Sequence, residues 1–307
     1  MPLDSVVENV PIAARPGVVL GDDTVADVAA LLPEVGRRAL DMISVIDLLS
    51  ADPAAFERLR AASASRTGGA PLARVRLLAP VPRPRRNVFC VGWNYSEHFQ
   101  EGANLRAAQG DPGQQAIPEY PALFSKNPAT VTGPDSSVLF PAPASEQLDW
   151  EVELAVIVGR PGHDISESDA MQHVFGYTCA NDVSVRDVQR RHGGQWFKGK
   201  NFDTHLPMGP WIVTADELDA SALRVQTRVN GVTKQDSNTR FMVFKIPRLV
   251  SEFSVGCRLE AGDIMITGTP EGVGFARKPP EFMKIGDVVE VEIEKIGILR
   301  NTVAGRS

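Results

Sequence analysis

Two glutamates stand at the start of a segment that otherwise has the pattern of a buried strand. Residues 148–159 read LDWEVELAVIVG. Because side chains alternate between the two faces of a strand, Glu151 and Glu153 point to one side, and the apolar residues next to them point to the other. Residues 155–158 are apolar on both faces, which is typical of a strand inside a packed sheet. The fold must therefore accommodate two like charges at the end of a buried strand.

Two neighbouring carboxylates on a half-buried strand repel each other, and each of them loses hydration. A divalent cation bound between them is the simplest compensation. The alternative is an ordinary amphipathic strand whose polar face meets solvent. Both interpretations stay open from these residues alone.

The composition of the 307-residue chain indicates a globular protein with one large domain, or with a small and a large one. Hydrophobic residues make up 43% of the chain and charged residues 23%, which is enough apolar material for a full core. The formal net charge of -6 argues against a nucleic-acid binder and against binding to an anionic membrane surface.

Neither a membrane span nor a secretion signal is predicted. No apolar run approaches the ~20 residues of a transmembrane helix, and residues 1–5 lack the basic start and apolar block of a signal peptide. Cys90, Cys179 and Cys257 are few, odd in number and far apart. This spacing favours reduced thiols over a disulfide framework, so we expect a cytoplasmic protein.

Residues 1–80 are predicted to form a small N-terminal module, and residues 81–307 a large, strand-rich domain. The segment 79–86, rich in proline and arginine, is typical of an extended linker between them. The elements expected in the module are a hairpin at 18–23 and helices at 24–32, at 39–49 and from 52 onward, where Asp52-Pro53 places proline in a first turn.

The large domain is expected to be mixed but mostly β, so the fold class is α+β. Its predicted strands are short, with no regular alternation of strand and helix and no repeats. Asn230-Gly231 is a strong hairpin signal, because both residues tolerate positive φ. The expected helices cover 166–174 and 247–254. The expected strands cover 87–91, 138–140, 150–158, 177–180, 211–214, 223–229, 263–267 and 288–293.

Asp182 is a third carboxylate of interest, because it ends a predicted strand and begins a turn. With Glu151 and Glu153 it would complete an all-oxygen ligand set, which suits Mg²⁺, Mn²⁺ or Ca²⁺ rather than zinc. The alternative role is the N-cap of a helix that follows at 185–190.

His98 and Glu101 form a second candidate pair. Their spacing of three residues places them on one face of a predicted helix. A carboxylate beside a histidine orients the ring and raises its basicity, which suits a general base that acts on water. The alternative is a surface pair without a catalytic role.

Two lysines and one turn are candidates for binding an anion. Lys126 and Lys200 lie among glycine, proline and aromatic residues, and Lys198 competes with Lys200 for the same role. Residues 267–274 read TGTPEGVG, and the small residues around Gly268 and Thr269 allow backbone N–H groups to approach an anion. The alternatives are solvated loop lysines and an ordinary tight turn.

Taken together and in this order, these segments resemble the fumarylacetoacetate hydrolase family over roughly residues 85–304. The N-terminal module is similar to the one that many bacterial members carry. The segments that carry the resemblance are 92–101, 124–128, 150–155, 181–189, 199–203 and 267–274, with the tail at 284–293 and 297–301.

The resemblance implies a mixed β-roll fold, a homodimer and a bound Mg²⁺, Mn²⁺ or Ca²⁺. It implies that Glu151, Glu153 and Asp182 are the metal ligands and that His98, Glu101 and Lys200 are catalytic. It also implies substrate contacts from Lys126, Gln189, Gly268 and Thr269. The additional metal-binding aspartate of the founding hydrolases, and their substrate-gripping tyrosine and arginine residues, have no match here. The chain therefore looks more like the smaller members of the family.

The activity implied is hydrolysis of a C–C bond in an acylpyruvate-type oxo acid. The cation would stabilise the enolate that forms when the bond breaks, while His98, oriented by Glu101, removes a proton from the attacking water. The same site could instead serve an isomerase or decarboxylase of a hydroxymuconate-type diacid of aromatic catabolism, or an oxaloacetate decarboxylase. A non-catalytic Ca²⁺ site on a β-scaffold is a third possibility.

Residues 103–120 contain several glycines and prolines in their second half. We therefore expect a mobile segment that orders over a bound ligand and brings His98 and Glu101 toward the metal. The alternative is a surface insertion with no part in binding.

Overall fold

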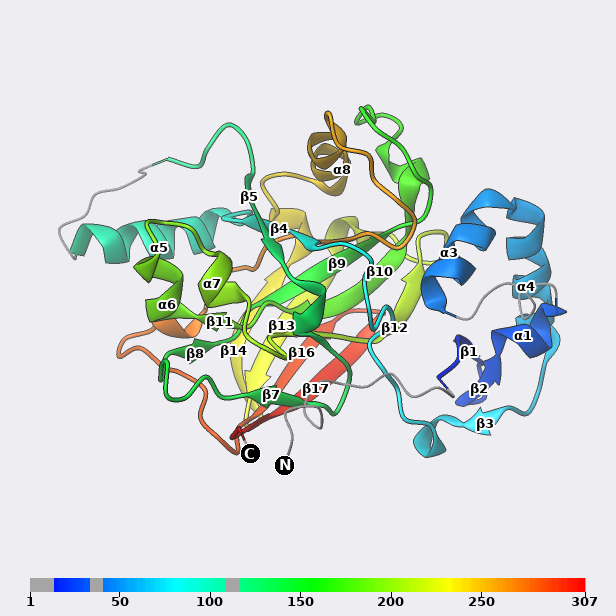
Figure 1. The fold of residues 1–307 in the computed structure, drawn as a ribbon, viewed down its shortest axis with the longest axis horizontal. Coiled ribbons are helices and arrows are strands. Elements are labelled where there is room, and N and C mark those ends of the chain that lie inside the picture. The colour runs from blue at the N-terminus through cyan, green and yellow to red at the C-terminus, as the bar shows by residue number, and fades with distance from the viewer. Residues whose placement is uncertain (1–13, 34–40, 109–115, 307) are drawn as a thin grey trace.

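The computed structural model describes residues 14–33, 41–108 and 116–306, and of residues 104–108 it describes only the backbone. A seven-stranded sheet forms the centre of the molecule, in the order β5-β4-β15-β9-β10-β12-β6 (Figure 1). Its strands are β4 (Val88–Gly92), β5 (Ala122–Lys126), β6 (Val131–Thr132), β9 (Val152–Val158), β10 (Val174–Asn181), β12 (Leu206–Thr214) and β15 (Ile264–Ile266).

A five-stranded sheet packs against it, in the order β14-β13-β16-β17-β7. A short two-stranded sheet lies near the carboxylates discussed below. The strands of the larger sheet are β7 (Ser137–Leu139), β13 (Arg224–Val229), β14 (Val232–Asn238), β16 (Val288–Ile293) and β17 (Gly297–Ala304). Those of the two-stranded sheet are β8 (Leu148–Asp149) and β11 (Ser184–Val185).

The main hydrophobic core lies between the seven-stranded and five-stranded sheets. It joins alternate residues of β9, such as Val152 and Leu154, to Val291 and Leu299 of the other sheet. The opposite face of β9, with Ala155 and Ile157, packs in a second core. The alternation places Glu153 on the side of this second core, away from the five-stranded sheet.

Helices cover the edges of this sandwich. In Figure 1, α5 (Ser96–Ala108), α6 (Arg186–Arg191) and α7 (Phe197–Lys200) lie at one end, and the N-terminal elements lie at the other. Helix α8 (Ile246–Ser254) buries Leu249, Val250 and Phe253 in the main core. Short 3₁₀ helices are η2 (Leu72–Arg74), η3 (Pro128–Thr130), η4 (Ala170–His173), η5 (Ala220–Ala222), η6 (Thr239–Phe241) and η7 (Gly274–Ala276).

The described part of residues 14–80 forms a three-stranded sheet with helices beside it. Its elements are β1 (Gly17–Val19), β2 (Thr24–Asp27), β3 (Ala70–Pro71), α1 (Val28–Leu31), α3 (Met42–Ala51) and α4 (Pro53–Ser65). This part has its own apolar cluster, yet Ile43 and Ile46 of α3 also pack on the seven-stranded sheet. The domain boundary at residue 80 stays a prediction.

Most predicted elements of the large domain are present, and the mostly β, α+β architecture is confirmed. Strand β16 covers the predicted residues 288–293, and the turn at Asn230 and Gly231 joins β13 to β14 with φ of 51° and 77°. The N-terminal hairpin is confirmed as β1 and β2. Asp52 caps α4 by accepting from Ala54 N and Ala55 N.

Three predictions about local structure are wrong. Residues 24–27 form a strand rather than the start of a helix, because Thr24 and Val25 pair with β3. The predicted helix at 166–174 is only the 3₁₀ helix η4. The segment 79–86 is not the extended linker that was expected, since residues 80–83 and 85–86 are bends and Ala79 and Val81 are buried in the second core.

Two further predictions concern mobility and environment. Residues 109–115, the centre of the expected mobile segment, lie outside the described residues, and residues 103–108 belong to α5. No helix in the described ranges is both long and apolar enough to cross a membrane. The three cysteines are free thiols, with Cys90 and Cys179 buried and Cys257 exposed.

Candidate active site

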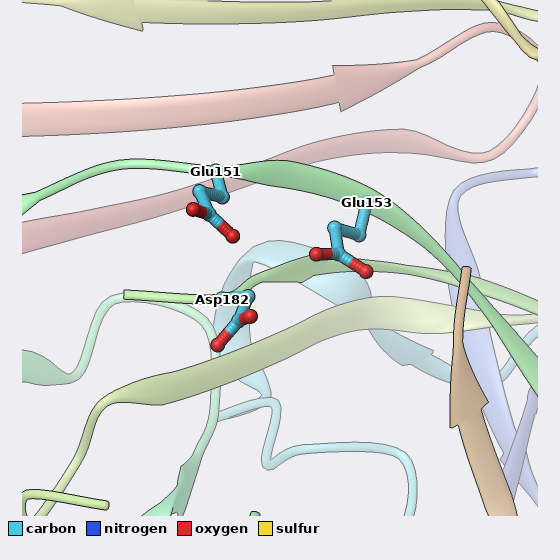
Figure 2. Close-up of side chains that lie close together, drawn as sticks. All are labelled: Glu151, Glu153 and Asp182. Carbon is cyan, nitrogen blue, oxygen red and sulfur yellow. The ribbon is translucent and has the colours of Figure 1, made fainter. Parts of the chain in front are cut away.

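Three carboxylates converge where strands β9 and β10 meet. Glu151, Glu153 and Asp182 each offer one ligand atom, and these atoms all lie within 4.8 Å of one another. All three residues are buried, with exposed fractions of 4%, 2% and 0%. Figure 2 shows the three side chains close together, with Glu151 and Glu153 on the side of their strand that faces Asp182. The structure thus brings together the three acids that the sequence singled out.

The antiparallel pairing of β9 and β10 places this triad. The register opposes Glu153 to Ala180, and Asp182 N donates to Glu151 O at 2.9 Å two residues further along. Directly opposed residues share a face of a sheet. Asp182 therefore faces the same side as both glutamates, although it lies about 30 residues from them in the sequence.

The alternative role of Asp182 as a helix cap is wrong. Helix α6 begins at Arg186, and its N-cap residue is Val185, which makes no side-chain cap. The Asp182 carboxylate instead faces two lysines.

Two lysines supply positive charge to the triad. Lys200 Nζ donates to Glu151 Oε2 at 2.7 Å and to Asp182 Oδ2 at 2.5 Å. Lys126 Nζ lies 2.7 Å from Asp182 Oδ1, an ion-pair distance without hydrogen-bond geometry, and it donates to Val183 O at 3.2 Å. Lys200 lines the adjoining cavity. Lys126 is fully buried and is not among the lining residues, so its visible partner is Asp182 rather than the cavity.

Arg186 connects the triad to a neighbouring carboxylate. Its Nη1 lies 2.7 Å from Glu151 Oε1 and donates to Gln189 Oε1 at 3.2 Å, while its Nε donates to Asp149 Oδ2 at 2.7 Å. The guanidinium stacks on Phe275, 4.4 Å from the ring centre. Its Nη2 is buried and has no hydrogen-bond partner among the described residues. Arg186 therefore keeps one donor unused beside the cavity that it lines.

The two glutamates have opposite electrostatic environments. Burial disfavours the charge of Glu151, but Lys200, Arg186 and His98 outweigh it and hold its pKa below the ordinary value. Burial raises the pKa of Glu153 well above its ordinary value, and Asp182 and Glu151 raise it further. Negative charge is therefore compensated at Glu151 and uncompensated at Glu153.

The lysines respond to the same charges in different ways. Burial alone would lower the pKa of Lys200, but Asp182 and Glu151 outweigh it, so the pKa is raised. Burial lowers the pKa of Lys126 despite the opposing effect of Asp182. Lys200 is thus the more firmly charged partner of the triad.

The residues present fit a hard divalent cation. Among the described residues, Glu151, Asp182 and Asp149 each have a cationic side chain within ion-pair distance, and Glu153 has none. Glu153 accepts one hydrogen bond, from Gly268 N at 2.6 Å. A buried carboxylate without a charged partner is costly. Three convergent carboxylates are also the donor set that Mg²⁺, Mn²⁺ and Ca²⁺ prefer.

The predicted His98–Glu101 pair lies on α5 as expected. His98 Nδ1 is 3.6 Å from Glu101 Oε2, which is longer than a hydrogen bond, and this nitrogen has no partner among the described residues. Glu101 instead accepts from Gly272 N at 3.0 and 3.1 Å. His98 lines the cavity, which is the position a group needs to exchange a proton with a bound small molecule.

The turn at 268–272 ties the parts of the site together. Gly268 N donates to Glu153, and Gly272 N donates to Glu101. Gly272 O accepts from Trp150 Nε1 at 3.2 Å. Thr269 is 3% exposed and lines the cavity. The turn therefore holds the triad, the Glu101 carboxylate and Thr269 in one frame.

A cavity of about 190 Å³ lies beside the triad and is lined by two of its carboxylates, those of Glu151 and Glu153. Its apolar wall includes Trp93, Phe124 and Trp196, and the two tryptophan rings meet edge to face at 4.9 Å. Its polar wall consists of His98, Glu151, Glu153, Arg186, Gln189, Arg190, Lys200 and Thr269. This mixture of apolar walls and converging charges is typical of a small-molecule enzyme site.

Three functional neighbours were not singled out from the sequence. Arg186 stands inside the motif 181–189, and Asp149 directly precedes the glutamates, but neither position shows its partner in the sequence. Gln235 donates to Thr269 Oγ1 at 2.9 Å from strand β14, 34 residues away. No local pattern predicts a contact across that distance.

A strand sandwich with a buried acidic triad beside a cavity defines a class of enzymes that act on small molecules with a bound cation. The chain belongs to the fumarylacetoacetate hydrolase family. The family model described as fumarylacetoacetate (FAA) hydrolase C-terminal matches residues 87–304. The predicted family and its fold are therefore confirmed.

Two relatives are similar to this chain over most of its length. The chain is 43% identical to the mitochondrial oxaloacetate tautomerase Fahd2a of Rattus norvegicus over 286 residues, which cover 88% of this chain and 87% of that protein. It is 44% identical to oxaloacetate tautomerase YisK of Bacillus subtilis (strain 168) over 233 residues, 76% of this chain and 74% of that protein.

A solved structure supports the fold over almost the whole length. Fumarylacetoacetate hydrolase from psychrophilic Exiguobacterium antarcticum superposes with a TM-score of 0.75 at 36% identity, covering 95% of each chain. The shared fold includes the N-terminal part as well as the large domain.

Proposed function

We propose that this enzyme is a divalent-cation-dependent keto–enol tautomerase of a 2-oxo dicarboxylic acid such as oxaloacetate. The observation that carries the proposal is the buried triad of Glu151, Glu153 and Asp182, two of which line a cavity that His98 also lines. The names of the rat and Bacillus relatives, both oxaloacetate tautomerases, support it. It corresponds to the isomerase alternative of the sequence analysis rather than to hydrolysis.

Glu151, Glu153 and Asp182 would hold the cation. When bound, Mg²⁺ or Mn²⁺ supplies Lewis acidity that favours negative charge on the keto oxygen of a 2-oxo acid. Lys200 donates to two of the three carboxylates and so keeps their oxygens oriented. Lys126 holds the other oxygen of Asp182 from its buried side.

His98 is the group that we assign to proton transfer at carbon. In the direction from enol to keto form, one proton leaves the C2 hydroxyl and one arrives at C3, so no water is consumed. His98 lines the cavity, and its buried Nδ1 has no hydrogen-bond partner among the described residues. A histidine can give and take a proton near neutral pH. Glu101 Oε2 lies 3.6 Å from the Nδ1 of His98.

The positively charged side chains that line the cavity favour a substrate with two carboxylates. Arg186 has an unused Nη2, and the exposed Arg190 lines the cavity from the same helix, α6. Thr269 lies at the turn bonded to Glu153. A diacid can place one carboxylate by Thr269 and the other by Arg186 Nη2 and Arg190, whereas a monoacid can use only one of these two positions.

Hydrolysis of an acylpyruvate is the second candidate. It requires an attacking water held between a base and the substrate, and the pair His98 and Glu101 is the feature that favours it. The two residues are not hydrogen-bonded to each other. The names of the relatives support tautomerisation instead.

We also propose that the protein is a homodimer, as the family resemblance implies. Sedimentation analysis tests this directly. A species of about 66 kDa, twice the 33.2 kDa chain, is expected, and a single species of chain mass would contradict it.

The function is tested by adding the purified protein to the enol form of oxaloacetate and following the loss of enol absorbance. Faster loss with Mg²⁺ or Mn²⁺, abolished by EDTA, is expected. Carbon dioxide release and acetylpyruvate cleavage are measured in parallel. Cleavage or decarboxylation that outpaces tautomerisation would replace the proposal with one of the other two reactions.

A further inference from the structure

Gln235 is a buried polar residue to which the proposed function gives no role. It lies on β14, an edge strand of the five-stranded sheet, and is only 1% exposed. A buried side-chain amide needs partners for two hydrogens and two lone pairs. The identity of those partners fixes how the amide is oriented.

All four hydrogen-bonding positions of this amide are occupied. Gln235 Oε1 accepts from Val152 N at 3.0 Å and from Thr227 Oγ1 at 2.8 Å. Gln235 Nε2 donates to Pro270 O and to Thr269 Oγ1, each at 2.9 Å. The amide therefore joins strand β9, between its two glutamates, to the turn that carries Thr269.

The orientation of the amide has no alternative. Val152 N can only donate, so it must face the amide oxygen, and Pro270 O can only accept, so it must face the amide nitrogen. A flipped amide would oppose donor to donor and acceptor to acceptor. Gln235 Nε2 must therefore donate to Thr269, and the Thr269 hydroxyl must accept.

This arrangement controls the hydroxyl proton of Thr269. Since Oγ1 accepts from Gln235, its own hydrogen points elsewhere, and no acceptor for it is found among the described residues. Thr269 lines the cavity. The hydroxyl is thus held as a donor toward whatever oxygen enters the cavity beside Glu153.

The turn approaches β14 closely enough to make this contact rigid. Gly272 has a φ of +93°, and a Cβ atom on it would lie 2.3 Å from Lys234 O. A larger residue could not adopt this approach without moving the turn. The backbone thus sets the distance that the Gln235–Thr269 bond requires.

We propose that Gln235 is a positioning residue that fixes Thr269 as a hydrogen-bond donor to a carboxylate of the substrate, in register with the triad. The proposal rests on the proposed function, because it assumes a 2-oxo acid in the cavity. Gln235 itself does not touch the substrate. Its influence passes through the Thr269 hydroxyl and through the backbone of Val152.

Gln235→Glu is the informative variant, because the new carboxylate keeps the two accepted bonds and loses the two donated ones. Thr269 would then turn its hydrogen toward that carboxylate. We expect oxalate binding with Mg²⁺ to weaken about tenfold, the value of one hydrogen bond to a charged group. KM for oxaloacetate should rise by a similar factor, with a smaller change in kcat.

Matched variants separate positioning from a loss of stability. Thr227→Val removes a bond to the same Oε1 but leaves both donated bonds, so oxalate affinity should stay unchanged. Thr269→Val should lose the same factor as Gln235→Glu, and Thr269→Ser should retain wild-type affinity. In the double variant Gln235→Glu/Thr269→Val the two losses should not add.

Wild-type affinity for oxalate in Gln235→Glu, or additive losses in the double variant, would overturn the proposal. If Gln235→Glu fails to fold, a crystal structure of the wild-type protein with oxalate and Mg²⁺ decides. Thr269 Oγ1 must then lie within hydrogen-bond distance of oxalate while keeping the bond from Gln235. Failure of the wild-type protein to bind oxalate or to tautomerise oxaloacetate would instead contradict the proposed function.

Discussion

Asp149 and the triad are buried carboxylates, and Asp149 lies close to Glu151 and Glu153 in the sequence. Asp149 and the triad differ in how many hydrogen-bond donors surround their oxygens. Asp149 accepts four hydrogen bonds, from Trp150 N, Gly274 N, Phe275 N and Arg186 Nε, at 2.7–2.9 Å. The triad two residues further along has fewer donors, and its Glu153 has one backbone donor and no cationic side chain within ion-pair distance among the described residues.

The difference shows how one stretch of sequence serves two purposes. A carboxylate with four donors, one of them a guanidinium, is fully compensated and holds the start of η7 in place. A carboxylate short of donors has oxygen lone pairs left for a ligand. The contrast assigns Asp149 to stability and the triad to function, and isosteric substitutions on each side test it.

The largest effect on stability is expected for Asp149→Asn. The substitution removes one of the two carboxylates that pair with buried Arg186, and its NH₂ group must face two of the four N–H donors. The free energy of unfolding should fall by about 3–5 kcal/mol, and added Mg²⁺ should not restore it. Urea unfolding with and without Mg²⁺ measures this. An unchanged free energy of unfolding would remove the structural half of the comparison.

Glu153→Gln should weaken metal binding and leave the stability of the metal-free protein unchanged. Loss of a ligand should weaken Mg²⁺ binding by more than about 100-fold, the upper range for residues that only support ligands. The metal-free protein should keep its stability, because repulsion from Asp182 and Glu151 is relieved. Titration calorimetry and thermal unfolding check the two parts. Strong destabilisation without loss of Mg²⁺ affinity would show that Glu153 resembles Asp149.

Lys126→Met tests whether the buried lysine stabilises the fold or contacts the substrate. The metal-free protein should lose about 2 kcal/mol, because Asp182 loses a charged partner, and Mg²⁺ should restore part of it. Unfolding curves at several Mg²⁺ concentrations provide the measurement. A rise in KM for oxaloacetate with unchanged stability would instead support the substrate contact that the sequence predicted for Lys126.

His205 gives a smaller, pH-dependent effect on the compensated side. Burial lowers its pKa to about 3, against the hydrogen bond to Leu139 O. Because the folded-state pKa lies below the unfolded value of about 6.5, the neutral ring stabilises the fold above pH 6.5, and this contribution is lost as the pH falls toward 3. At pH 5 the loss should be about 2 kcal/mol.

The measurement for His205 is urea unfolding at pH 7.5 and pH 5. The drop in stability between the two values should be smaller in His205→Gln than in the wild-type protein. Equal drops would mean that the ring is not held neutral.

The local part of the site could be predicted from the sequence, and the contacts between distant segments could not. Alternation along 151–158 revealed the paired glutamates, because strand geometry acts over neighbouring residues. Asp182 was a candidate third ligand because it ends a predicted strand, but only the family resemblance favoured that role over a helix cap, since strand pairing sets its distance from the glutamates. Gln235 and Asp149 contact residues 269–275, which lie far from both of them in the sequence. No spacing pattern in the sequence predicts such contacts.

The wrong predictions about the fold also come from contacts between segments that are distant in the sequence. Residues 24–27 have helical spacing, yet pairing with β3 overrides it. The residues at 79–86 look like a linker, yet Ala79 and Val81 complete a core formed by distant strands. In each case a tertiary contact outweighed a local preference.

Anomalous diffraction from a crystal soaked in Mn²⁺ tests the central claim most directly. One manganese peak is expected within bonding distance of oxygens from Glu151, Glu153 and Asp182 together, and it should be absent in Glu153→Gln. A peak bound elsewhere, or none at all in the wild-type protein, would contradict the assignment of these three carboxylates as the cation site.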